Sequence, residues 1–185
     1  MQKNTLKIFI RLSLNPFICI FVCYFKYEYR MEIRQAKESQ LLEVLYIVRE
    51  CAFQLQEKGV KYWHNSHADY AEILKDILDK RVFVLLYRKM VVGTATVKQD
   101  PEGNGIMKVS RLAVLPSFQR RGFAKELLKY AVDEAKTHSA KTLRGVTPID
   151  DTSTNQLFEQ AGFAFKSTTS TSESDPPRVI FEKLL

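Results

Sequence analysis

The stretch from residue 109 to residue 128 constrains the fold most, because it joins a strand pattern to a glycine turn and an amphipathic helix. Apolar residues run through the strand, and Pro116 stops it before the turn. After Gly122, apolar residues recur at helical spacing with charged residues on the opposite face. A helix N-terminus presents unpaired N–H groups and the positive end of the helix dipole, so an anion there is stabilised. The junction predicts a phosphate-binding turn, with an ordinary capped helix as the alternative.

The composition of the turn supports the binding of a diphosphate. Gly122 lets the backbone approach a ligand closely, and Arg120 and Arg121 add two positive charges. We expect the contacts to come from Gln119, Arg120, Arg121, Gly122, Phe123, Ala124 and Lys125.

From residue 31 onward, strand and helix periodicities alternate along the chain. The pattern predicts strands at 32–35, 82–87, 91–97, 106–115, 142–147, 163–167 and 178–183. Helices are expected from a Ser39 cap to Gly59, at 68–80, after the glycine turn, and at 152–161. The polar segment 167–177 reads as a hairpin loop. We therefore expect one domain over residues 31–185.

Two motifs resemble a known family. The spacing Gln119-x-x-Gly122-x-Ala124 resembles the acyl-CoA pyrophosphate loop of the GNAT superfamily of N-acetyltransferases. The stretch Leu157-Phe-Glu-Gln-Ala-Gly-Phe163 is similar to the C-terminal helix of that superfamily and the strand after it. The order of the predicted elements agrees with the same family. The resemblance implies the acyl-CoA N-acyltransferase fold, an α/β (α+β) fold whose mixed, mostly antiparallel central sheet is flanked by helices.

The same resemblance implies an activity. An acetyl group would pass from acetyl-CoA, the cosubstrate, to a primary amine of a small molecule or peptide by direct attack in a ternary complex. In such proteins the strand before the phosphate loop splays from the next strand, and the pantetheine arm bonds to backbone between them. That backbone corresponds to Leu112, Ala113 and Val114, facing Val146 and Thr147. The alternative is an acyl-CoA-binding regulatory module with little or no catalysis.

The catalytic acid and base are not evident from the sequence. A protonated amine cannot attack, so a base is usually required. Many relatives carry a glutamate on the strand before the phosphate loop, but residues 108–114 contain none. Phe158 stands where relatives have a tyrosine that protonates the departing thiolate. The candidate bases are His64, His67, Asp69 and Glu102, with solvent-facing loop histidines as the alternative.

Further binding residues are expected on both sides of the cleft. Tyr62, Trp63, His64 and Thr147 are candidates for the acceptor pocket, although Trp63 could instead fill a gap between helices and sheet. Asp151, Asn155 and Phe158 complete the coenzyme set. Helix capping is the alternative role for Asp151 and Asn155.

Charge and cysteine usage limit the partners. The net charge is +7, but residues 1–30 hold five basic residues and one acidic residue, which leaves +3 for the rest. The sequence contains no basic stripe with interleaved aromatic residues, so it does not indicate nucleic-acid binding. Cys19, Cys23 and Cys51 form neither a metal-ligand spacing nor a disulfide framework, so we expect no metal and a reducing, cytoplasmic setting. The oligomeric state stays open, with a homodimer as one candidate.

Residues 1–30 differ from the rest of the chain. An apolar run over residues 16–25 is flanked by positive charges, but it is too short to span a bilayer and lacks a small-x-small cleavage site. One interpretation is an artefactual or disordered extension upstream of Met31, rich in residues with AT-rich codons. The other is an interfacial segment that associates with membranes. We expect the fold to begin at Met31, with no membrane partner for the domain.

Overall fold

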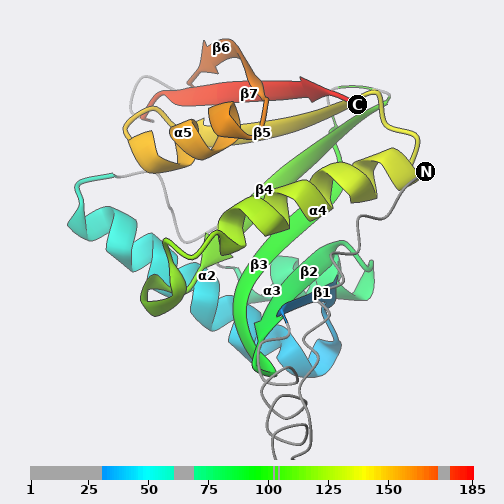
Figure 1. The fold of residues 1–185 in the computed structure, drawn as a ribbon, viewed down its shortest axis with the longest axis vertical. Coiled ribbons are helices and arrows are strands. Elements are labelled where there is room, and N and C mark those ends of the chain that lie inside the picture. Colours follow the sequence, from blue (N-terminus) through cyan, green and yellow to red (C-terminus); the bar gives the residue numbers. More distant parts are fainter. Residues whose placement is uncertain (1–30, 61–68, 102, 104, 171–175) are drawn as a thin grey trace, which may run out of the picture. The chain divides into compact units, whose positions relative to one another are not determined.

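A computed structural model describes residues 31–60, 69–101, 103, 105–170 and 176–185 (Figure 1). The elements are β1 (Met31–Gln35), the 3₁₀ turn η1 (Glu38–Gln40), α2 (Leu41–Glu57), α3 (Tyr70–Leu78), β2 (Val82–Tyr87), β3 (Met90–Gln99), β4 (Ile106–Val114), the 3₁₀ turn η3 (Pro116–Phe118), α4 (Phe123–Thr137), β5 (Thr142–Pro148), α5 (Thr152–Gln160), β6 (Ala164–Thr169) and β7 (Arg178–Leu184). This order confirms the predicted succession of strands and helices.

The strands form one seven-stranded sheet in the order β1-β2-β3-β4-β5-β7-β6. Every neighbouring pair is antiparallel except β4 and β5, which run parallel. The predicted fold class is confirmed as a mixed, mostly antiparallel sheet flanked by helices.

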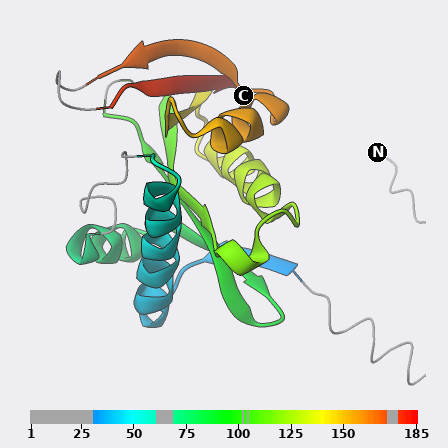
Figure 2. The ribbon, with the colours of Figure 1, turned by 90° about the vertical axis from the view of Figure 1, so that its left-hand side faces the viewer.

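The two faces of the sheet are covered by different helices, because successive strand residues point to opposite faces. On β2, Phe83 and Leu85 pack in a core that includes the buried side of α4. Val82 and Val84 pack instead with α2 and α3. Figure 2 shows α2 and α3 on one side of the sheet and α4 and α5 on the other. The apolar periodicity of each helix therefore faces its own core.

The parallel pair β4 and β5 is hydrogen-bonded over only part of its length. Pairing runs from Ile106 with Thr142 to Val109 with Gly145 and then stops, whereas β5 continues to pair with β7. Beyond this point β4 carries an irregularity opposite β3, where Arg111 takes a left-handed φ of +49°. Such an irregularity bends a strand. The bend lies where β4 leaves β5, so the two strands diverge toward the start of α4.

Two helix starts differ from the predicted ones. Ser39 does not cap α2, because it lies inside η1, and Gln40 accepts the Lys37 N–H through its side chain at 3.1 Å. The second helix begins at Tyr70 rather than residue 68, since Asp69 caps it by accepting the Glu72 N–H at 2.8 Å. None of the described helices combines the length and apolar character needed to cross a bilayer.

Candidate active site

The start of α4 offers open hydrogen-bond donors. Gly122 precedes the helix with a φ of +83°, and the first intrahelical bond runs from the Glu126 N–H to the Gly122 carbonyl at 3.1 Å. The N–H groups of Phe123, Ala124 and Lys125 therefore have no acceptor within the helix. A Cβ added at Gly122 would meet no atom within 4 Å. This open helix start can hold an anion.

The side chains around the turn hold its shape. Gln119 donates through Nε2 to the Val114 carbonyl at 2.9 Å and to Gln54 Oε1 at 3.0 Å, which ties the turn to β4 and α2. Arg121 donates to the Ser117 carbonyl at 3.2 Å, and its guanidinium lies 5.1 Å from the centre of the Phe118 ring. The structure thus turns Arg121 back onto η3 and does not bring it into the pocket.

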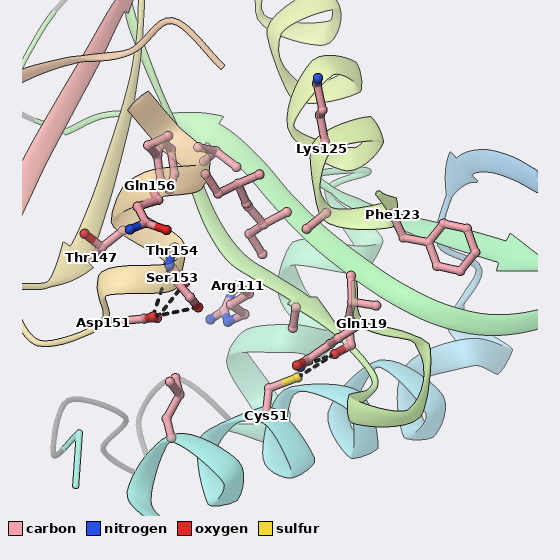
Figure 3. Close-up of a pocket in the computed structure, with 18 of the residues that line it drawn as sticks. Cys51, Arg111, Gln119, Phe123, Lys125, Thr147, Asp151, Ser153, Thr154 and Gln156 are labelled. Carbon is pink, nitrogen blue, oxygen red and sulfur yellow. Dashed lines mark hydrogen bonds between the residues drawn. The ribbon is translucent and has the colours of Figure 1, made fainter. Parts of the chain in front are cut away.

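A pocket of about 510 Å³ opens between the diverging strands, the start of α4, the end of α2, and α5 (Figure 3). The predicted residues that line it are Leu112, Ala113, Val114, Gln119, Arg120, Gly122, Phe123, Ala124, Lys125, Thr147, Asp151 and Phe158. Two predicted contributors, Arg121 and Asn155, are not among the lining residues. Tyr62, Trp63, His64, His67 and Glu102 lie outside the described residues.

Capping accounts for the polar groups at the start of α5. The Asp151 carboxylate accepts the Thr154 N–H at 3.1 Å, the Thr154 hydroxyl at 2.6 Å and the Ser153 hydroxyl at 3.3 Å. Asn155 accepts the Thr147 hydroxyl and donates to the carbonyls of Pro148 and Ile149. These bonds fix the connection between β5 and α5. Asp151 also reaches the pocket wall, while Asn155 acts behind it.

Phe158 forms part of the pocket wall with carbon atoms alone. Its ring is stacked on Phe181 at 5.5 Å and meets Phe163 edge-on at 5.0 Å. The side chain is buried on α5 and has no group that ionises. It therefore supplies no proton to the pocket.

Comparison with known proteins identifies the family of this chain. The sequence matches the model of the Acetyltransferase (GNAT) family over residues 42–163, which is more than half of the chain. The chain belongs to the GNAT family. The matched residues include the α4 turn, the diverging strands and Phe158. A search of curated protein sequences gave no significant match.

Solved structures share the fold of this GNAT protein. PaiA N-acetyltransferase of Thermoplasma acidophilum, solved with coenzyme A, gives a TM-score of 0.71 at 16% identity, over 84% of this chain and 99% of that one. YncA of Salmonella typhimurium, described as a putative acetyltransferase with its cofactor acetyl-CoA, gives 0.69 at 17%, over 84% and 94%. Ribosomal-protein-alanine N-acetyltransferase of Brucella melitensis gives 0.68 at 20%, over 83% and 99%. At such identities the likeness shows the fold alone.

Sequence reasoning missed Cys51 as a lining residue of this GNAT pocket. Its thiol donates to the Val114 carbonyl at 3.2 Å, the same oxygen that Gln119 bonds. Burial raises the pKa of Cys51 to about 11, against a smaller lowering by the bond to Val114. The thiol is therefore neutral at pH 7 and a poor nucleophile. Its position among the apolar residues of α2 indicates that Cys51 faces inward. Its contact with Val114 could not be predicted, because the two residues lie far apart in the sequence.

Sequence reasoning also missed a charge cluster around Arg111, a buried residue that lines the pocket. Arg111 donates to Asp76 Oδ2 and to Glu72 Oε2, both at 2.6 Å, and Asp76 also meets Lys98 at 3.2 Å. Burial pushes the pKa of Asp76 upward, but its bonds to Arg111 and Lys98 and their charges outweigh this, so the pKa lies below its usual value. The cluster anchors α3 to the bend in β4. Its sequence signal is an arginine in an apolar strand and an aspartate on the apolar face of a helix.

Proposed function

We propose that this GNAT protein transfers an acetyl group from acetyl-CoA to a primary amine of a small molecule or peptide by direct attack in a ternary complex. The observation that carries the proposal is the open start of α4 at the mouth of the pocket between β4 and β5. Structures with the same fold, solved with coenzyme A or acetyl-CoA, support the choice of cosubstrate.

In this proposal the diphosphate of the coenzyme binds the N–H groups at the start of α4, with Arg120 as the nearby cation. The pantetheine arm follows the backbone of β4. Because the Val114 carbonyl already accepts bonds from Gln119 and Cys51, and the backbone of Ala113 faces its partner Thr94 on β3, the arm would bond to backbone at Leu112 and to the N–H of Val114. These two residues lie on the pocket side of the divergence.

The chemistry depends mainly on positioning. Holding the amine lone pair against the thioester carbon in a closed cleft removes most of the entropic cost of the encounter. Backbone N–H groups near the carbonyl would stabilise the developing oxyanion. A thiol with a pKa of about 8.5 leaves tolerably without a proton donor, so Phe158 slows the step and does not forbid it.

The base of the proposed reaction should be one of the four candidates that the sequence offers. Asp69 already caps α3 by accepting the Glu72 N–H, and it is not among the residues that line the pocket. His64, His67 and Glu102 therefore take precedence over Asp69. Tyr62, Trp63 and Thr147 remain our candidates for acceptor contacts.

A catalytically weak acyl-CoA-binding module is the second candidate function. Two observations favour it. Phe158 offers the pocket no proton, and the described residues of β4 include no acidic side chain. The two functions separate in one assay, in which free thiol released from acetyl-CoA is measured with and without an amine panel. An amine-dependent release above background supports the transferase, and binding without release supports the module.

The coenzyme site is tested by titration calorimetry of acetyl-CoA with the full chain and with Gly122→Glu. The new carboxylate projects into the open space before α4 and repels the diphosphate, so binding should fall at least tenfold. The matched control is Gly105→Glu at the other end of β4, because Gly105 has a similar φ of +80° and its Cβ would meet nothing nearer than the Lys141 side chain at 3.8 Å. Equal binding by the two variants would remove the α4 start from the coenzyme site.

A further inference from the structure

Arg111 has an unusual backbone conformation for a strand residue in the pocket wall. Its φ of +49° is left-handed, and the other non-glycine residues of the described chain with such a φ all lie in turns. A Cβ makes this conformation costly. Residues in sparsely populated backbone regions persist only where their surroundings hold them, and they cluster at functional sites. The contacts of Arg111 must therefore hold its conformation.

The left-handed residue begins a β-bulge. Thr96 pairs with Ser110, and Thr94 pairs with Ala113, so two residues of β4 stand opposite one residue of β3. A bulge whose first residue is left-handed usually has glycine at that position. Because β4 has Arg111 there instead, the residue type does not account for the bulge.

The bulge decides which backbone groups face the pocket. The Leu115 N–H bonds the Val92 carbonyl, and the backbone of Ala113 likewise faces β3. Since backbone groups alternate along a strand, Leu112 directs its N–H and carbonyl to the opposite side, where β5 no longer pairs with β4. Without the extra residue, Leu112 would pair with Thr94 and face β3.

Two carboxylates of α3 hold the Arg111 side chain. Nη1 donates to Asp76 Oδ2 and Nη2 donates to Glu72 Oε2, both at 2.6 Å. The side chains of Arg111 and Asp76 are each only 5% exposed, and Lys98 also donates to Asp76 at 3.2 Å. Separating a buried ion pair leaves a charge without a partner, so such pairs resist displacement. The carboxylates of α3 thus oppose a rotation of Arg111 toward an extended φ.

We propose that Arg111 is a positioning residue for the thioester of acetyl-CoA. Its bonds to α3 hold the left-handed bulge, and the bulge turns the Leu112 backbone toward the pantetheine arm. In this role Arg111 acts through the backbone of β4 and touches neither reacting atom. The inference rests on the proposed function, because it assigns a role within the same coenzyme site.

Two substitutions of Arg111 separate backbone conformation from side-chain contacts. Arg111→Met removes the ion pairs but keeps a Cβ, so the left-handed conformation should be lost. Arg111→Gly also removes the ion pairs, but glycine adopts a positive φ readily. Titration calorimetry should show the affinity for acetyl-CoA falling about tenfold in Arg111→Met and staying within about threefold of the parent in Arg111→Gly. A merely structural role predicts the reverse order, since glycine removes more of the side chain.

ADP and Arg144→Met are the matched controls. ADP carries the diphosphate without the pantetheine arm, so its affinity should be the same in the parent chain and in both variants of Arg111. Arg144 also lies between two carboxylates, those of Asp100 and Glu182, with a side chain only 13% exposed. It belongs to β5 and is not among the lining residues of the pocket. Its loss should cost stability and leave the affinity for acetyl-CoA unchanged.

Glu72→Ala tests the same contact in a milder way. The Glu72 side chain is 60% exposed, so its removal should leave the fold intact while it frees one end of the Arg111 guanidinium. The affinity for acetyl-CoA should fall by a smaller factor than in Arg111→Met, and the affinity for ADP should not change. Thermal melting verifies that each variant is folded at the temperature of the titration.

The outcomes for Arg111 and for the transfer reaction are distinguishable. The proposal is overturned if neither Arg111→Met nor Glu72→Ala weakens acetyl-CoA binding, if Arg111→Gly loses as much affinity as Arg111→Met, or if Arg144→Met shows the same loss. Thiol release with the amine panel measures the transfer separately. If no amine gives release while the order of affinities holds, the proposed transfer fails and the role of Arg111 in positioning the coenzyme stands.

Discussion

The ring of Phe158 lies against the backbone of Gly145, at the last pair before β4 and β5 diverge. A Cβ added at Gly145 would lie 2.2 Å from Cε1 of the ring, far inside van der Waals contact. Phe163 and Phe181 hold the ring from other sides, so it cannot swing away. The missing side chain at Gly145 therefore makes room for the aromatic wall of the pocket.

Gly145→Ala should destabilise the fold, because the added methyl group overpacks a rigid core. We expect a loss of about 1–3 kcal/mol in the free energy of unfolding, measured by urea denaturation. The smaller side chain of Phe158→Leu relieves the contact, so the double variant should lose less than the sum of the single losses. Strictly additive losses would show that the two residues do not interact.

Arg111→Met should cost far more stability than Arg81→Met. Arg111 is buried between Asp76 and Glu72, and removing one partner of a buried pair costs about 3–5 kcal/mol. Arg81 also meets Asp76, at 3.6 Å, but its side chain is 43% exposed, and such surface pairs contribute at most about 1 kcal/mol. Denaturation of both variants measures the difference. Equal losses would show that Arg111 does not anchor α3 to β4.

The stability that Asp76 contributes should disappear in acid. The folded state lowers the pKa of Asp76 below its usual 3.8 because Arg111 and Lys98 outweigh the effect of burial. A lowered folded pKa means that this stabilisation is present above pH 3.8 and is lost as the pH falls through that value toward the folded pKa. The stability gap between the parent chain and Asp76→Asn should therefore narrow below about pH 4. Urea unfolding over a pH series measures the gap, and a constant gap would contradict the lowered pKa.

The periodic elements and the helix start at Gly122 could be predicted because they depend on local sequence. Apolar spacing identifies the strands and helices, and a glycine before an amphipathic helix identifies the turn. Even so, the Ser39 cap was wrong, since a 3₁₀ turn precedes α2 and Ser39 lies within it. A cap depends on the local backbone path, which the residue type alone does not determine.

The contacts that complete the site depend on tertiary structure and could not be predicted. The bend at Arg111 depends on how β4 pairs with β3, and the contact between Gly145 and Phe158 depends on how α5 packs on β5. The direction of the Arg121 side chain is set by Phe118, which lies in the preceding 3₁₀ turn. Long-range pairing thus decides which residues of a motif face the pocket.

Cys51 should not carry an acetyl group, although it lines the pocket. Its pKa of about 11 leaves very little thiolate at pH 8, and the thiolate is the reactive form. Incubation with acetyl-CoA should therefore give no acetylated Cys51. Iodoacetamide should modify Cys51 much more slowly in the folded chain than in urea, where the pKa returns to its usual range. Peptide mapping by mass spectrometry measures both reactions. An acetylated Cys51 peptide would replace direct attack with a covalent intermediate on this thiol, and the proposed reaction would need to be revised.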